Sequence, residues 1–367
     1  RKIHLTKQFG INFAGFSLLI IAGVLSFYNI WPDQFAESFK YLWRFIAFNY
    51  LLYFLLVQEI VRKAKQFWTL SWFIYALGIF LSIMGLVSFY WPEVNHSFPM
   101  ATPLSWFGLF PLGASHNLLA ESLVSIIPFS WLLIYKLGND RRVKYLNYGL
   151  SLMIAVCILT FSRTGWLVLA LELLILYITY YRVKVTSIIQ KYWPLALGVL
   201  LLFGVYFITF AQTDFVTSSN EARLAMIERS VYMFDQHPFL GNGVGTWQPM
   251  VSQDMYYVYE FGQPLEQHGV VWKLMAEQGL FGILIWFTIM FYMLYYSYYI
   301  YHRLEHDNPW QMAALVAGVV IVGQIVFQLL DTGYYSPKMW LPLGLAMALL
   351  HIAKRYQGLL NKIIFDN

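Results

Sequence analysis

Cysteine and charge are both scarce in this chain of 367 residues, which has one Cys and 12% Asp, Glu, Lys and Arg. The single Cys157 leaves no partner for an intramolecular disulfide and no thiolate set for a metal ion. Soluble domains have about a quarter charged residues, so the composition excludes an ordinary soluble domain. Hydrophobic residues make up 59% of the chain instead. This composition predicts a protein that lies in a membrane.

The apolar residues gather into about ten runs, each close to the roughly 20 residues that a helix needs to cross a bilayer. The runs lie near residues 10–31, 41–58, 67–91, 118–137, 144–161, 164–181, 193–210, 272–301, 310–330 and 339–354. We therefore expect an all-α polytopic membrane protein with a single transmembrane domain over residues 1–367. The first run has no small-residue cleavage site, so we expect no signal peptide.

Lysine and arginine are unequally divided between the two sides of these runs. If the loops alternate and the N-terminus is inside, 17 of the 24 Lys and Arg residues lie on the inner side and 7 on the outer side. Cytoplasmic loops of membrane proteins have such an excess. We expect both ends of the chain to be cytoplasmic. The net charge of +5 reflects this asymmetry and does not indicate a nucleic-acid surface.

Two of the predicted outer loops are long. The first, 92–117, is rich in Pro, Gly and aromatic residues, and the second, 211–271, is the largest segment outside the membrane. A long loop in a compact protein is usually functional or disordered, and the aromatic content of both loops argues against disorder. We expect the second loop to carry functional residues.

Within the second loop, "SNEARLAMIERSVYMFDQHP" predicts an amphipathic helix that begins with Ser219 or Asn220 as its N-cap and ends before Pro238. Its apolar stripe is expected to face the bundle and consists of Leu224, Ile227, Val231 and Phe234. Arg223 lies at the edge of this stripe and Arg229 roughly opposite. We expect Arg223 to reach a polar cavity, with a surface helix whose two arginines are solvated as the alternative.

Arg163, in "FSRTGW", lies in a predicted tight turn between the fifth and sixth runs. An arginine so close to hydrocarbon is costly unless it pairs with an anion, and its planar guanidinium suits a diphosphate. The alternative is a residue that snorkels to the interface, but a cation on the outer side runs against the charge bias. We predict that Arg163 binds an anionic substrate.

His268 comes just before the eighth run, at the predicted boundary between water and lipid. An imidazole there can accept a proton from a sugar hydroxyl near neutral pH, although a hydrogen-bonded structural histidine is an alternative. Glu277 follows on the same run, where it could hold an arginine. No His and carboxylate pair on the outer side has the spacing of metal ligands, so we expect no metal.

The stretch "HPFLGNGVGTWQ" has Gly241, Gly243 and Gly245 at alternate positions, which resembles a phosphate-binding loop. A dinucleotide fingerprint, however, follows a strand and opens a helix, whereas here a predicted helix precedes the glycines. We interpret His237 and these glycines as structural support that positions Arg223 and His268.

Four motifs in this order resemble the O-antigen ligase and polymerase superfamily of bacterial membrane glycosyltransferases. They are "SHNLLAESL", which contains Asn117, then "SRTGW", "HPFLGNGVG" and "AEQGLFG", and together they cover roughly residues 110–290. The family often has about a dozen spans, which implies one or two more before Arg1. The resemblance also implies a fold similar to the GT-C class of membrane glycosyltransferases.

The resemblance implies an inverting, metal-independent transfer of a glycan from undecaprenyl diphosphate to an acceptor hydroxyl on a lipid core or other surface molecule. The reaction would take place on the periplasmic side of the inner membrane and would use no cofactor. By the same resemblance, Arg163 and Arg223 bind the diphosphate and His268 is the catalytic histidine. Asn117, Glu277, Arg229 and His237 are possible supporting residues. The family often has His-Asn where this chain has His268-Gly269, which puts an acceptor contact in doubt.

Several functions share these motifs, and the sequence does not choose among them. A polymerase that extends the glycan and a relative that glycosylates protein belong to the same superfamily. A transporter of the lipid-linked glycan would use the same arginines, but only Glu121 and Glu172 are candidates for the midspan groups that transport needs. A non-catalytic membrane scaffold would leave the outer Arg and His residues unexplained.

Overall fold

Every regular element in the described part of the chain is a helix, as the sequence predicts. The computed structural model describes residues 7–91, 99–105, 109, 113–181, 214–264, 266–305, 308–331 and 336–365. Eight helical segments are long and apolar enough to cross a membrane. They coincide with eight of the ten expected runs, and a further helix covers the last. The run at 193–210 lies outside the described residues.

The elements follow the chain in a simple order. They are α1 (Lys7–Ser26), η1 (Phe27–Asn29), α2 (Phe35–Tyr41), η2 (Leu42–Ala47), η3 (Tyr50–Leu56), α3 (Val57–Ile60), α4 (Ala64–Val87), α5 (His116–Leu137), α6 (Arg142–Leu159), α7 (Arg163–Tyr181), α9 (Asp214–Gln236), α10 (Trp247–Val251), α11 (Met255–Phe261), α12 (Val270–Arg303), α13 (Pro309–Leu330) and α14 (Pro337–Phe365). The stretches η2 and η3 are π-helical and continue α2 into α3, so these elements form one span from 35 to 60.

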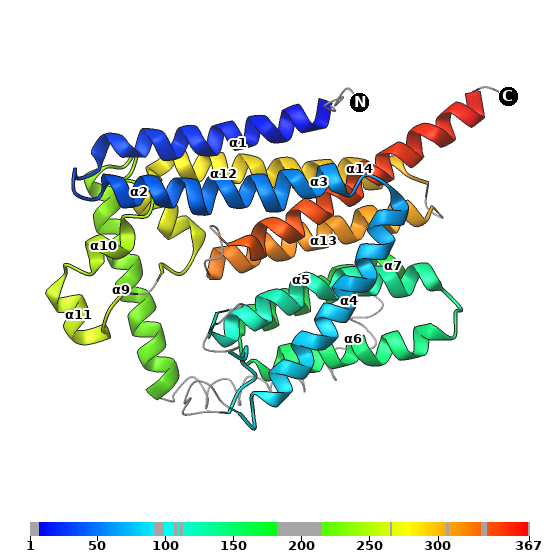
Figure 1. Cartoon of the computed structure of the whole chain (residues 1–367), viewed down its shortest axis with the longest axis horizontal. Coiled ribbons are helices and arrows are strands. Elements are labelled where there is room, and N and C mark those ends of the chain that lie inside the picture. Colours follow the sequence, from blue (N-terminus) through cyan, green and yellow to red (C-terminus); the bar gives the residue numbers. More distant parts are fainter. Residues whose placement is uncertain are drawn as a thin grey trace, which may run out of the picture.

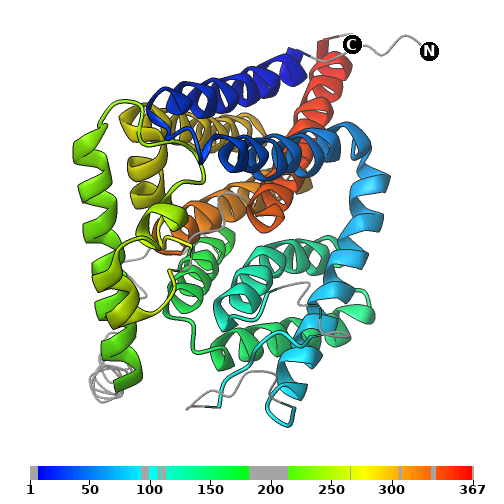
Figure 2. The same ribbon diagram turned by 60° about the vertical axis from the view of Figure 1, so that its left-hand side comes forward.

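Helix α13 lies at the centre of the bundle, where it packs against α12, α14, α7 and α5. Large aromatic side chains, among them Trp286 and Trp340, are fully buried in this core. Figure 1 shows both termini at one end of the bundle and α9, α10 and α11 at the opposite end. Figure 2 shows α9 along one side of the bundle, where it packs against α12, and α4 on the other side. Both chain ends thus share one end of the bundle, as the charge distribution predicts.

Helix α9 begins five residues before the predicted N-cap at Ser219, so the prediction of its start is wrong. Asn220 lies inside the helix, where its side chain accepts a hydrogen bond from Arg163 Nη2 at 3.0 Å. Asn is only modestly unfavourable in a helix interior, so a good capping residue does not force a helix to begin there. The helix ends at Gln236, before Pro238, as expected.

The buried face of α9 also differs from the predicted apolar stripe. Met226, Ser230 and Met233 are buried against Trp247, whose Nε1 donates to Ser230 Oγ at 2.9 Å. Leu224 and Val231, by contrast, are 58% and 37% exposed. A prediction from hydropathy places the most apolar face of a helix inward. The hydrogen bond from Trp247, however, offsets the free-energy cost of burying the Ser230 hydroxyl. The most apolar face of this helix is therefore not the face that it buries.

Candidate functional site

His268 precedes α12 and lies beside the carboxylate of Asp331, which ends α13. Its Nδ1 is 2.8 Å from Asp331 Oδ1, and the two side chains are 28% and 11% exposed. A carboxylate at this distance accepts a hydrogen bond from Nδ1–H, which leaves Nε2 as the nitrogen that can take up a proton. The contact with Asp331 therefore fixes the orientation of the imidazole ring.

The polar contacts continue from Asp331 into the start of α5 and α14. The ammonium group of Lys338 lies close enough to interact electrostatically with both Asp331 and Glu121. The buried Glu121 also accepts a hydrogen bond from Gln328 Nε2 at 3.0 Å. The start of α5, the end of α13 and the start of α14 are thus tied together by charge beside His268.

A second set of charges holds the segment that leads into α12. Glu266 forms an ion pair with Lys273 and accepts a hydrogen bond from Tyr41 Oη at 2.9 Å. Burial opposes ionisation of Glu266, but the Lys273 charge and these hydrogen bonds outweigh it and hold the pKa of the carboxyl below its usual range. The Lys273 ammonium is also 3.7 Å from Glu277 Oε1. The cation found beside Glu277 is thus a lysine, where the sequence suggested an arginine.

Arg163 is the first residue of α7 and follows a sharp turn. Phe161 in this turn has φ of 53°, and Ser162 Oγ accepts a hydrogen bond from Gly165 N at 3.1 Å, which caps the helix. Arg223 of α9 lies close enough for its charge to act on Arg163. Among the described residues, neither guanidinium pairs with a carboxylate. Two neighbouring cations of this kind would be stabilised by an anion bound to both.

Arg229, on the other side of α9, has a different environment. Its Nε lies 2.8 Å from Asp254 Oδ2, at the start of α11. Asp254 also caps α11 by accepting hydrogen bonds from Tyr256 N and Tyr257 N. Arg229 therefore fastens α11 to α9, whereas Arg223 is placed beside Arg163.

The arginine pair and the His268 pair lie at the same level of the bundle. Helices α7 and α13 run in opposite directions, and they touch where Glu172 faces Gly323. Arg163 lies nine residues from Glu172 and Asp331 eight residues from Gly323, both toward the same end of the bundle. At 1.5 Å per residue these distances are about 13 and 12 Å along the axes. The His268–Asp331 pair and the two arginines thus lie at the same end of adjacent helices.

The glycine stretch packs directly on a break in α12. Asn242 N donates to Ala276 O and Gly243 N to Glu277 O, both at 3.0 Å. Gly279 has φ of 61°, so α12 is interrupted there. The carbonyl oxygens of Ala276 and Glu277 therefore accept hydrogen bonds from the glycine stretch in place of the next helical turn. A Cβ at Gly241, whose φ is 71°, would overlap the main chain of Glu277. The stretch thus fixes the first turns of α12, directly after His268.

Replacing Gly241 by alanine is expected to destabilise the fold by about 2 kcal/mol or more, since it adds a main-chain clash to a left-handed backbone conformation. Gly262 provides the matched control, because its φ is 77° and a Cβ there meets nothing within 4 Å. Gly262→Ala is expected to cost only the conformational strain, about 1 kcal/mol. Thermal unfolding of the two purified variants measures the difference, and equal melting temperatures would contradict the packing role of Gly241.

The remaining predicted supporting residues lie in the same region. His237 contributes its carbonyl, which accepts a hydrogen bond from Gly241 N at 2.9 Å. Gly245 packs on the ring of Tyr41, which also contacts Glu266 and Lys273. Asn117 is the second residue of α5, where its N–H donates to the capping Ser115 Oγ at 3.3 Å.

An apolar groove of about 600 Å³ begins near Lys338 and is lined by η3, α4, α5 and α14. Its walls include Leu77, Leu81, Ile126 and Leu341, and Lys338 also lines it. Leu77 and Leu341 are themselves exposed on the bundle surface, so the groove reaches the lipid-facing side. Within the described residues, no three His, Cys, Asp or Glu side chains gather closely enough to hold a metal ion.

Comparisons with known proteins found one matching family and a similar fold. Residues 148–287, which include Arg163, Arg223 and His268, match the family described as O-antigen ligase. A solved chain from "Structural coordination of polymerization and crosslinking by a peptidoglycan synthase complex" has a similar fold, with a TM-score of 0.51, 13% identity, and coverage of 94% of this chain and 97% of that chain. No curated protein matches.

The family match and the eight candidate spans support a multi-pass bacterial membrane protein of the ligase or polymerase type of glycosyltransferase. At 13% identity the solved chain speaks for the fold alone. The resemblance predicted from the four motifs is confirmed, since residues 148–287 match the O-antigen ligase family.

Proposed function

We propose that this protein transfers a glycan from undecaprenyl diphosphate to an acceptor hydroxyl, in the manner of an O-antigen ligase. The reaction takes place on the outer face of the cytoplasmic membrane. The lysine and arginine distribution predicts that α7 begins and α13 ends on this side. The observation that carries the proposal is the His268–Asp331 pair at the same level as Arg163 and its neighbour Arg223. A base and an anion site at one end of the bundle suit the transfer of a glycan from a lipid diphosphate.

In the proposed reaction, Nε2 of His268 takes the proton of the acceptor hydroxyl as its oxygen attacks the anomeric carbon of the donor sugar. The new C–O bond forms on the face opposite the diphosphate, so the configuration inverts as the bond to the diphosphate oxygen breaks. The leaving lipid diphosphate gains one negative charge, which Arg163 and Arg223 offset. Positioning and cationic stabilisation can supply much of the rate for such a leaving group.

The apolar groove beside Lys338 supports a substrate with a lipid chain. A chain bound between Leu81 of α4 and Leu341 of α14 would keep its apolar surface out of water while its head stays near Lys338 and Asp331. A soluble sugar nucleotide would have no use for such a groove. The groove thus favours a lipid-linked donor or a lipid acceptor.

The proposal is tested by incubating the purified protein in liposomes with a lipid-linked glycan, with and without a lipid-core acceptor. A single product that needs the lipid-core acceptor is expected of a ligase. A ladder of lengthened lipid-linked products would identify a polymerase instead. Movement of the intact donor across the liposome membrane, without any transfer, would indicate the transporter alternative and overturn the proposal.

Asp331→Asn is expected to lower kcat by at least about tenfold, because an amide does not stabilise the imidazolium that forms when His268 takes the proton. The KM for the donor should change little, since Asp331 contacts the base rather than the diphosphate. The measurement is kcat and KM in the liposome assay across pH 5 to 9. An unchanged kcat and pH profile would show that Asp331 does not act through His268.

A further inference from the structure

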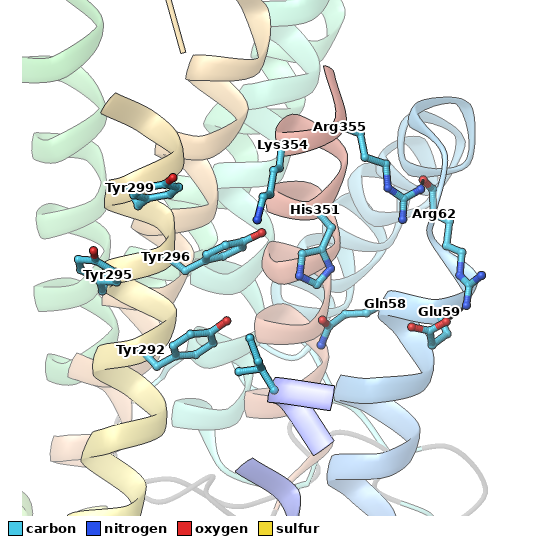
Figure 3. Close-up of a pocket in the computed structure, with 11 residues that line it drawn as sticks. Gln58, Glu59, Arg62, Tyr292, Tyr295, Tyr296, Tyr299, His351, Lys354 and Arg355 are labelled. Atoms are coloured by element: carbon cyan, nitrogen blue, oxygen red, sulfur yellow. Dashed lines mark hydrogen bonds and ion pairs between the residues drawn. The ribbon is translucent and has the colours of Figure 1, made fainter. Parts of the chain in front are cut away.

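A second pocket, of about 520 Å³, lies at the opposite end of the bundle from His268. It opens between α12, α14, α3 and the start of α1, at the end that contains both termini (Figures 1 and 3). The distribution of lysine and arginine predicts that this end is cytoplasmic. The pocket therefore takes no part in the proposed transfer on the other side.

The walls of this pocket are rich in hydrogen-bond donors and positive charge. Helix α14 contributes Lys354 and Arg355, and α12 contributes a row of four tyrosines, at 292, 295, 296 and 299. Figure 3 shows the hydroxyls of Tyr292 and Tyr296 pointing from α12 toward α14 and α3. The Lys354 ammonium lies 5.6 Å from the centre of the Tyr296 ring. Ammonium, guanidinium and phenol groups are together suited to an anion with several oxygens.

The one carboxylate in the pocket wall is already paired. Glu59 forms an ion pair with Arg62, whose main-chain carbonyl accepts a hydrogen bond from Arg355 Nη1 at 3.0 Å. Among the residues that the structure describes, neither Lys354 nor Arg355 pairs with a carboxylate. The pocket thus retains two positive charges that no acidic side chain of the described chain balances.

A buried polar atom at the same place lacks a partner in the part of the chain that the structure describes. His351 Nε2 is buried and makes no hydrogen bond to any described residue, although its ring packs against Tyr296 at 5.8 Å between centroids. Figure 3 shows the His351 ring between α14 and the two inward-pointing tyrosines, Tyr292 and Tyr296. A buried polar group without a partner is costly, typically about 1–3 kcal/mol. A ligand oxygen in the pocket would satisfy the imidazole nitrogen.

From these observations we infer that the pocket binds a phosphate group, presented by an anionic phospholipid of the leaflet at this end. The phosphate oxygens bind Lys354, Arg355 and the tyrosine hydroxyls. The lipid chains extend along the exposed apolar surface beside the pocket, where Phe291 and Tyr295 are 61% and 66% exposed. Basic pockets between membrane helices recognise such headgroups by charge.

The test is the affinity of the full-length protein, purified in a neutral detergent, for three probes: dioctanoyl phosphatidylglycerol, dioctanoyl phosphatidylcholine and inorganic phosphate. Binding is followed by the shift in melting temperature at increasing probe concentration. We expect saturable stabilisation by phosphatidylglycerol with at least about tenfold tighter apparent Kd than phosphatidylcholine. Equal affinity for the two lipids would overturn the inference. A shift with inorganic phosphate as large as with the lipid would identify the free ion as the ligand of the same site.

Two double variants separate this pocket from general surface charge. Lys354→Gln with Arg355→Gln removes both pocket cations, and Arg141→Gln with Lys144→Gln removes two exposed cations before and within α6 that do not line the pocket. The first pair should weaken binding of phosphatidylglycerol at least about tenfold, and the second by less than about twofold. Equal losses in the two variants would overturn the inference. Because the readout is binding, its outcome is independent of whether the protein transfers glycans.

Discussion

His268→Ala is expected to lower the rate of glycan transfer by about 10²- to 10⁴-fold, the range over which a positioned general base contributes to a reaction. The loss should appear in kcat, with little change in the KM for the lipid-linked donor. His268→Gln should be as inactive as the alanine variant, since an amide can still hydrogen-bond to Asp331 but cannot accept a proton at neutral pH. The measurement is initial-rate kinetics with purified donor in liposomes.

His302 supplies the matched control for this prediction. It lies in the last turn of the same helix, α12, and its ring packs at a tilt against Tyr298, with 4.2 Å between ring centroids. His302→Ala should leave transfer within about twofold of the unsubstituted protein, because its side chain lies at the far end of the bundle. If the His268→Ala and His302→Ala variants transferred glycan at the same rate, His268 would not be the base.

Removing either arginine of the pair, by Arg163→Ala or Arg223→Ala, is expected to lower kcat/KM by about 10²-fold or more, because each offsets charge on the leaving diphosphate. Arg163→Lys should recover part of the loss, since lysine retains the charge but not the two-pronged hydrogen bonding. The double alanine variant should lose less than the product of the two single losses, because both groups act on one ligand. Kinetics of the four variants against donor concentration measure these effects.

Arg229→Ala is the control for the arginine pair. Arg229 lies on the same helix as Arg223 but pairs with Asp254, so its removal should reduce stability slightly and affect transfer much less. If Arg229→Ala impaired transfer as strongly as Arg223→Ala, the effect would come from a disturbed α9 and not from lost diphosphate binding.

Much of the fold could be predicted from the apolar runs in the sequence. Main-chain polar groups in lipid must be hydrogen-bonded within the protein, so a long apolar run crosses the membrane as a helix. Eight runs coincide with described helices that could span a membrane, and α14 covers a ninth, for this reason. The start and buried face of α9 could not be predicted. Asn220 is a good N-cap by local preference, yet its partner is Arg163, which is 57 residues away in the chain. Met226 and Ser230 are buried because they pack against Trp247. A hydropathy scale assigns a value to each residue type and does not describe such a tertiary contact.

The candidate site could be predicted only in part for the same reason. Arg163 and His268 are conspicuous because they are polar groups next to apolar runs on the side with few cations. Asp331 is equally visible in the sequence, but its contact with His268 joins residues that are 63 positions apart. The one feature of the sequence that points to Asp331 is its position directly after an apolar run, as His268 lies directly before one. The pocket beside His351 gave no signal, because tyrosines and cations at the end of a span are also typical of any membrane interface.

The measurement that tests the central claim most directly is the structure of the His268→Ala protein in a lipid nanodisc with an undecaprenyl-diphosphate-linked glycan bound. The account predicts that the diphosphate lies within hydrogen-bonding distance of both Arg163 and Arg223, with the anomeric carbon facing the space that the His268 imidazole would occupy. A diphosphate bound away from both arginines, or an anomeric carbon turned away from position 268, would contradict it.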